Sequence, residues 1–314
     1  MPAGIGASGS VGVAREVTAG TYVAPEKFIP IRSESLSYAQ ETIFTRSIRQ
    51  VADPVFAVPG NATIEGDIEF EVTHDTLPYL LYGMRGSVGK VGVADPFTYT
   101  LTPDASGQKS GTKTTLSFTI VRNAIVFGYT NCVIGSLELT VDNGIMVATV
   151  GVLGQDEASQ ADPTEAWPTS VPYGAGEYDI EIPSASAVTD VDTLTFTVND
   201  NPEHAYRLRS TGRGAQFTKF GERSVELSVE RDFIDRTDYD AFKALTAQAI
   251  TFKASKTTNR DVTVILRSAI KDTYEIGLDG QGDLVRASIT YQGIWNQASS
   301  ESYNIVVVTD EDIT

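Results

Sequence analysis

The sequence has very little of the residue types that catalytic and metal sites use most. Its 314 residues include one cysteine, Cys132, and two histidines, His74 and His204. A single cysteine excludes an intrachain disulfide framework, and so few histidines leave little material for a zinc site or for histidine-based catalysis. Cys132 lies among apolar residues and is expected to be a buried filler. We therefore expect that the protein is not an enzyme and that it holds neither a cofactor nor a metal ion.

Long apolar runs and familiar catalytic motifs are missing as well. No stretch approaches the roughly 18 apolar residues of a transmembrane helix, so no membrane partner is expected. The first residues lack the charged and apolar regions of a signal peptide. No G-x-S-x-G, H-E-x-x-H, Walker or EF-hand pattern occurs. The protein is therefore expected to be made in a cytoplasm-like compartment.

Acidic residues are in clear excess, and residues that favour strands are plentiful. The chain has 24 basic and 41 acidic residues and a formal charge of −17. Such a surface repels nucleic-acid phosphates instead of gripping them. The 41% of hydrophobic residues suffices for a substantial core. Because valine, threonine and aromatic residues are frequent and long helical periodicities are absent, the predicted class is mainly β.

The clearest local pattern is a strand followed by a short helix between Asn61 and Met84. From Ile64 to Val72, apolar residues and glycine alternate with carboxylates, which predicts one core-facing and one acidic face. Leucines at helical spacing follow, and Asp75 is expected to be the helix N-cap, with His74 on the surface. The carboxylates of the strand form an acidic ladder: Glu65, Asp67, Glu69 and Glu71.

The acidic ladder has three possible roles. Residues two apart on a strand stand nearly 7 Å from each other, because the rise is roughly 3.3 Å per residue. The carboxylates therefore cannot all close on one cation, and a solvated face is favoured over a calcium site. A third possibility is a negatively charged wall past which a polyanion slides without binding.

The second half of the chain repeats this order of elements. Glu222–Val229 lies 157 residues after Glu65–Val72, and a short helix is predicted at Asp238–Leu245. Asp261–Arg267 is matched with Thr115–Val121, and each half ends in a hairpin with a glycine-containing turn. We predict two tandem β-sandwich or barrel-like domains, each with one short helix. The predicted divisions are a flexible N-terminal arm (1–27), a first domain (28–155), a linker (156–189), a second domain (190–298) and a C-terminal tail (299–314).

Basic residues gather before the second strand–helix unit. They are Arg207, Arg209, Arg213 and Lys219. A nucleic-acid patch is one interpretation, but in so acidic a chain an acidic surface of another copy is the preferred partner, because complementary charge sets the register between subunits.

The order of elements resembles the major tail tube proteins of long, non-contractile-tailed bacteriophages. The resemblance rests on Gly20–Leu36 (GTYVAPEKFIPIRSESL), on Glu65–Gly83 (EGDIEFEVTHDTLPYLLYG) and on the hairpins near the end of each half. It covers most of Gly20–Gln297. It implies two tube-like β domains that assemble side by side into rings, with inner strands lining a channel through which the genome leaves the capsid.

What the resemblance implies about assembly is specific. A chain with two such domains is similar to those that build a trimeric ring of pseudo-sixfold symmetry, stacked into a tube in the virion tail and put together in the bacterial cytoplasm. Other tail proteins are expected partners, and DNA passes through without specific binding. Two other hypotheses stay open: another virion structural protein, such as a tail terminator or a capsid decoration protein, and a β-sandwich module that binds glycans.

Overall fold

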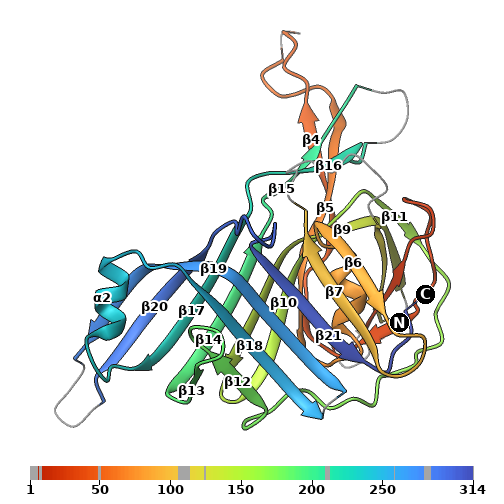
Figure 1. Ribbon diagram of the computed structural model, residues 1–314. Coiled ribbons are helices and arrows are strands. Elements are labelled where there is room, and N and C mark those ends of the chain that lie inside the picture. Colours follow the sequence, from red (N-terminus) through yellow and green to blue (C-terminus); the bar gives the residue numbers. More distant parts are fainter. Residues whose placement is uncertain are drawn as a thin grey trace.

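The protein is almost entirely β-structure. The computed structural model describes residues 6, 9–48, 51–104, 114–123, 125–208, 213–257, 259–278 and 284–313. Within these residues the chain forms open sheets and two short helices, which confirms the mainly-β, sandwich-like class (Figure 1). Neither helix is long and apolar enough to cross a bilayer, as far as the described residues extend.

The elements follow one another in a similar order in the two halves. The first half contains β1 (Ser10–Arg15), β2 (Lys27–Ile29), β3 (Ile31–Glu34), β4 (Ser37–Phe44), β5 (Ala57–Glu71), α1 (Leu77–Leu81), β6 (Gly86–Val91), β7 (Phe97–Pro103), β8 (Leu116–Arg122), β9 (Ile125–Asp142), β10 (Ile145–Gly154) and β11 (Asp156–Ser159). The second half contains β12 (Tyr178–Glu181), β13 (Ala187–Val188), β14 (Val191–Asn199), β15 (Pro202–Ala205), β16 (Phe217–Phe220), β17 (Ser224–Asp232), α2 (Thr237–Lys243), β18 (Gln248–Thr257), β19 (Arg260–Gly277), β20 (Arg286–Gly293) and β21 (Tyr303–Thr309).

One antiparallel sheet, here called the central sheet, runs through both halves. Its order is β3–β5–β10–β9–β14–β17–β20–β19, and β4 continues β3 along the same edge of β5. The pairing of β9 with β14 joins the halves, so the sheet crosses from one to the other without a break. The division into two domains with the predicted boundaries stays a prediction.

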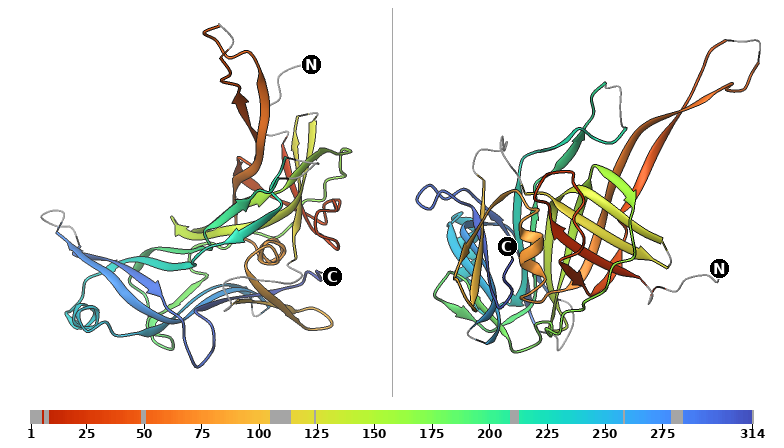
Figure 2. Two further views of the ribbon diagram at one scale, coloured as in Figure 1. Left: turned by 90° about the horizontal axis from the view of Figure 1, so that it is seen from above. Right: turned by 90° about the vertical axis from the view of Figure 1, so that its right-hand side faces the viewer.

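Two long strands connect the central sheet to side sheets. The first part of β9 pairs with β8 and β11, and its second part pairs with β10 and β14. Likewise β19 pairs first with β18 and β21, and then with β20. The first side sheet is β2–β1–β8–β9–β11, and the second is β13–β12–β18–β19–β21–β7–β6. In the view from above, the side sheets lie on one side of the central sheet (Figure 2, left).

This pairing corrects one detail of the predicted repeat. Both β9 and β19 have 18 residues and turn from a side sheet into the central sheet, so they are counterparts. Asp261–Arg267 lies in β19, whereas Thr115–Val121 overlaps β8, whose counterpart is β18. The match between those two segments was wrong because β18 was not predicted.

The core lies between the central sheet and the side sheets. In β5 the predicted alternation is confirmed, with Ile64, Ile68 and Phe70 buried. All five residues of α1 are buried under this face. Cys132 is also fully buried, as predicted, and burial raises the pKa of its thiol well above the ordinary value. The predicted hairpin turn after β9 is present, with Gly144 at a φ of 80°.

The N-terminal segment differs from the expected flexible arm. Ser10–Arg15 forms β1, which pairs with β8 over six residues and is buried along most of its length. Because β1 is covered on both faces, its residues show no polar–apolar alternation. The expectation of an adaptable arm is therefore wrong for this stretch, while Met1–Ile5 lies outside the described residues.

The acidic C-terminal segment is also part of the fold. Tyr303–Thr309 forms β21, which lies between β19 and β7. Beyond it, Glu311 pairs with Lys27 at 2.5 Å, and Asp312 pairs with Lys90. The acidic side chains of the C-terminal segment thus pair with lysines of β2 and β6. The expectation of a separate tail is wrong for these residues.

Asp75 and His74 are buried between these segments. Asp75 is not the helix N-cap, which is Thr76. Its carboxylate instead pairs with the Lys27 ammonium at 2.9 Å and accepts a hydrogen bond from the Thr73 hydroxyl at 2.6 Å. His74 is 8% exposed, so the expectation of a surface residue was wrong. His74 contacts Thr309 and Asp310 of the C-terminal segment, and Asp75 contacts Lys27 of β2, so both burials depend on residues far away in the sequence.

Candidate functional surfaces

The face of the central sheet that points away from the core, here called the polar face, is continuous across the two halves. Strand register puts Glu69, Thr149, Glu138, Thr197 and Glu226 in one row across β5, β10, β9, β14 and β17. These side chains are half-buried or exposed, while their neighbours along each strand are buried. Threonine, serine and glutamate therefore form one hydrophilic wall spanning both halves.

Negative charge dominates the polar face. Its carboxylates on the central strands include Glu65, Asp67, Glu69, Glu71, Glu138, Glu226, Glu230, Asp232 and Glu275. The arginines on the same strands and face are Arg32 and Arg286, and both are already paired with carboxylates. A surface with this balance repels phosphate at neutral pH.

The predicted acidic ladder lies on this face, at its first edge. Arg32 donates to Glu71 at 2.9 Å, and the Ser33 hydroxyl donates to Glu69 at 3.0 Å. Glu65 and Asp67 are exposed. No group of three or more potential ligands in the described part of the chain is arranged to hold a metal ion. The role of the ladder as a channel wall stays a prediction.

The predicted basic contacts lie on a small arm built from β15 and β16. Arg207 stacks over the exposed Phe217 ring with 5.4 Å to the centroid. Arg213 donates to Gln40 at 3.2 Å, and Lys219 pairs with Glu203 at 2.7 Å on the surface. Arg209 lies outside the described residues. Contacts of these cations with another subunit remain a prediction.

A second arm, formed by β4 and the start of β5, carries apolar residues into solvent. Every residue of β4 is exposed, and Figure 2 (right) shows the hairpin projecting from the body. Its exposed apolar side chains include Tyr38, Ile43, Phe44, Phe56 and Val58. Exposed apolar groups gathered on one projection indicate a contact surface for another molecule. This surface was not among the predicted sites, because its apolar residues follow no regular spacing in the sequence.

A buried charged cluster connects the two halves behind the sheet. The Asp200 side chain is 1% exposed and accepts a hydrogen bond from Arg223 Nε at 2.7 Å. Arg85 Nη1 lies 3.4 Å from the same oxygen and donates to the Gly221 carbonyl at 2.9 Å. Arg223 also donates to the Arg85 carbonyl at 2.9 Å. Since Arg85 follows α1 and Arg223 precedes β17, the cluster ties the first half to the second.

A second buried polar site surrounds His74. Its Nδ1 lies 3.2 Å from the Thr309 hydroxyl and 3.4 Å from an Asp310 carboxylate oxygen. Burial lowers the pKa of His74 and outweighs the carboxylates of Asp75 and Asp310, which act in the opposite direction. In the folded protein the imidazole therefore stays neutral at a pH at which a free histidine already begins to bind a proton.

This gives a pH dependence of stability. The unfolded chain protonates His74 near pH 6.5, whereas the folded chain does so at lower pH, so the free energy of unfolding should fall as pH drops below about 6.5. The variant His74→Gln should flatten this part of the stability curve in urea titrations between pH 7 and 5. An unchanged slope in the variant would contradict the assignment to His74.

Comparison with known protein families gives a match over most of the chain. The model of one protein family, described as phage tail tube protein, matches residues 6–293. A search of curated proteins gives no match.

Proposed function

This chain belongs to the phage tail tube proteins, and we propose that its copies join edge to edge into rings whose polar faces line a channel for DNA. Family membership makes it a structural component of the virion tail that associates with itself and with other tail proteins. The observation that carries the proposal is the continuous, acidic polar face across both halves.

Both edges of the central sheet support assembly between copies. Among the described residues, β3 pairs with no strand except β5. At the other end, the part of β19 beyond Ala269 pairs, within the described part of the chain, with β20 alone. Open edges present unpaired backbone groups that readily join another strand, and ring closure removes them.

The number of strands favours several copies in a ring. A barrel of about eight strands has room inside for side chains only, whereas about 16–18 strands leave an aqueous channel. One chain contributes eight strands to the central sheet, so closure by a single copy would crowd its carboxylates together. Three copies give 24 strands, a wide channel and the pseudo-sixfold symmetry of a duplicated unit.

The charge of the polar face and the two projecting arms also support a role in a tube. A wall rich in carboxylates and hydroxyls gives DNA few cationic groups to bind, so the polymer slides past. The apolar β4–β5 arm and the basic β15–β16 arm project from the same region of the molecule (Figure 1). In a tube, they would contact the next ring of the stack.

Electron microscopy tests the proposal. Purified protein, or the tail of its parent particle, is expected to show stacked rings with three chains in each. Class averages along the axis give the symmetry, and mass measurement of released rings gives the number of chains. Six full chains per ring would contradict the stoichiometry. Dispersed monomers under all conditions, with no tube in a parent particle, would contradict the assembly.

A further inference from the structure

We infer that the basic β15–β16 arm is a buttress that fixes the direction of the apolar β4–β5 arm, so that the apolar arm meets the next ring in one orientation. The inference rests on the proposed function, in which the apolar arm contacts the next ring. Three features support it: a hinge near the base of the apolar arm, a firmly held root below the hinge, and hydrogen bonds from the basic arm to both strands at the hinge.

The apolar arm is a ribbon of two strands. β10 pairs with β5 from Ile64 onward, whereas residues 57–63 of β5 pair with β4 alone within the described part of the chain. Every residue of β4 is exposed. An isolated two-stranded ribbon is only marginally stable in water. The direction of this arm therefore depends on what holds its base.

A bulge near the base provides the hinge. The register of β4 with β5 shifts between Gln40 and Thr42, whose partners on β5 are Ala62 and Pro59. A bulge bends a strand and increases its twist, so the ribbon changes direction at this place. The hinge therefore consists of residues 40–42 of β4 and residues 59–62 of β5.

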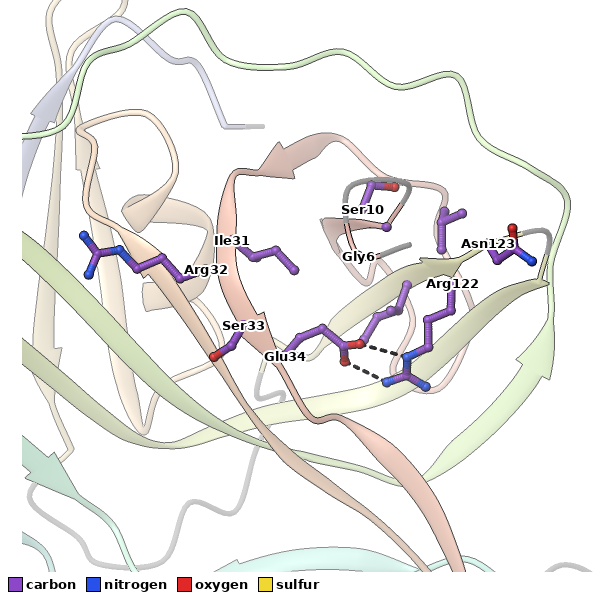
Figure 3. A pocket seen from close by; sticks show the side chains of 11 residues that line it. Gly6, Ser10, Ile31, Arg32, Ser33, Glu34, Arg122 and Asn123 are labelled. Carbon is purple, nitrogen blue, oxygen red and sulfur yellow. Dashed lines mark hydrogen bonds and ion pairs between the residues drawn. The ribbon is translucent and has the colours of Figure 1, made fainter. Parts of the chain in front are cut away.

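The root of the apolar arm, just below the hinge, is fixed by Arg122 of β8. Its guanidinium donates to the two carboxylate oxygens of Glu34 at 2.8 and 2.7 Å, and Figure 3 shows this ion pair between the ends of β3 and β8. The same guanidinium donates to the Leu36 carbonyl at 2.5 Å. Gly66 of β5 lies so close to Leu36 that a Cβ atom there would stand 2.5 Å from the Leu36 backbone. Movement of the arm is therefore confined to the hinge and the ribbon beyond it.

The basic arm binds the edge of β5 at this hinge. The Arg213 carbonyl accepts a hydrogen bond from the Ala62 backbone N–H at 3.1 Å, and the Tyr206 hydroxyl donates to the Ala62 carbonyl at 3.2 Å. His204 Nε2 lies 3.3 Å from the Ile64 carbonyl, and this nitrogen carries the hydrogen because a carbonyl only accepts. Three hydrogen bonds thus occupy the edge of β5 where β10 ends.

The basic arm also contacts β4 and the body of the first half. The Arg213 guanidinium donates to the Gln40 side chain at 3.2 Å, and Gln40 is the partner of Ala62 across the ribbon. Gly214 packs so closely that a Cβ atom there would stand 2.2 Å from the carbonyl oxygen of Gln155, directly after β10. The basic arm therefore connects both strands of the hinge to the body.

The two arms are equivalent hairpins that differ in what they contact. β4 follows β3 and leads into β5, and in the same order β15 follows β14 and β16 leads into β17. The first hairpin exposes apolar side chains, of which Phe44 and Phe56 are 58% and 53% exposed. The second directs the Tyr206 hydroxyl and the His204 imidazole toward the first. One hairpin thus projects, and the other supports it.

The Ala62 amide gives a direct readout of the buttress. It donates to Arg213 of the basic arm, so its hydrogen exchanges with solvent when the arm detaches. The double variant His204→Phe, Tyr206→Phe keeps two aromatic rings and removes both side-chain donors. A hydrogen bond of this kind contributes a factor of about 5 to an equilibrium constant, so hydrogen exchange at Ala62 should become about 25-fold faster.

Electron microscopy and mass measurement then compare assembly. The double variant should form rings of wild-type mass, because both edges of the central sheet are unchanged, and such rings also show that the variant folds. The ring concentration at which tubes form should rise at least about tenfold, because stacking is weakened by the fraction of arms that lose their orientation and each ring carries several arms.

A rescue variant and a matched control accompany this experiment. His204→Gln, Tyr206→Phe restores one donor, since a glutamine amide takes the place of Nε2, and should reverse part of both effects. Tyr178 also donates its hydroxyl hydrogen to backbone carbonyls, those of Gly144 and Tyr173, but it belongs to β12, which lies far from both arms in Figure 1. Tyr178→Phe should therefore change neither exchange at Ala62 nor stacking.

The possible outcomes separate the buttress from the tube function. Unchanged exchange at Ala62, or faster exchange with unchanged stacking, would overturn the buttress and leave the tube function standing. Loss of rings together with tubes in the double variant would indicate a role in folding or ring closure and would also overturn it. If the wild type forms neither rings nor tubes, the proposed function fails and the buttress role fails with it.

Discussion

Replacing Asp200 with alanine is expected to lower the free energy of unfolding by about 3–5 kcal/mol. The carboxylate is fully buried between Arg85 and Arg223, whose side chains are 5% and 10% exposed. Removing it leaves two guanidinium groups in a poorly solvated place without the shared counter-ion. The loss should appear as a lower midpoint in urea unfolding, followed by tryptophan fluorescence at neutral pH.

An exposed ion pair is the matched control. Glu203→Ala breaks the pair with Lys219, in which both side chains are more than half exposed. A surface pair of this kind contributes about 0–1 kcal/mol. Both variants remove one carboxylate, so a difference between their effects on the free energy of unfolding measures the contribution of burial. Equal effects would show that the cluster does not hold the halves together.

The strand pattern was predictable where one face of a strand is polar. In β5, Ile68 and Phe70 alternate with Asp67, Glu69 and Glu71, and the structure has the predicted face. In β1 the same logic fails, because both faces of Ser10–Arg15 are covered. For β21 one of the two partners is β7, about two hundred residues earlier in the chain, and such long-range pairing leaves no local pattern.

The candidate surface was predictable in part for the same reason. The acidic ladder at Glu65–Glu71 follows from alternation alone, but its continuation through Glu138 and Glu226 depends on the register of β9 with β14. Register across strands is set by tertiary packing, which composition and spacing do not encode. The buried places of His74 and Asp75 depend likewise on distant segments, since His74 contacts Thr309 near the C-terminus and Asp75 pairs with Lys27 of β2.

Charging the β19–β20 end should abolish ring formation without unfolding the chain. In the double variant Leu278→Glu, Leu284→Glu, two exposed apolar side chains beside the open edge of the central sheet at β19 become carboxylates. Burying two leucines contributes roughly 3–6 kcal/mol, so their loss weakens association by at least about 100-fold. Light scattering coupled to size-exclusion chromatography should show single chains at concentrations where the wild type gives rings.

The matched control adds the same charge elsewhere. Val17 and Val93 are more exposed than Leu278 and Leu284, at 97% and 101% against 83% and 63%, and they follow the side-sheet strands β1 and β6. The variant Val17→Glu, Val93→Glu should therefore still form rings. Both variants should unfold with the wild-type midpoint when they are single chains, because the altered side chains contact little within one copy. Rings in the leucine variant, or their loss in both variants, would contradict a contact between copies at the β19 edge.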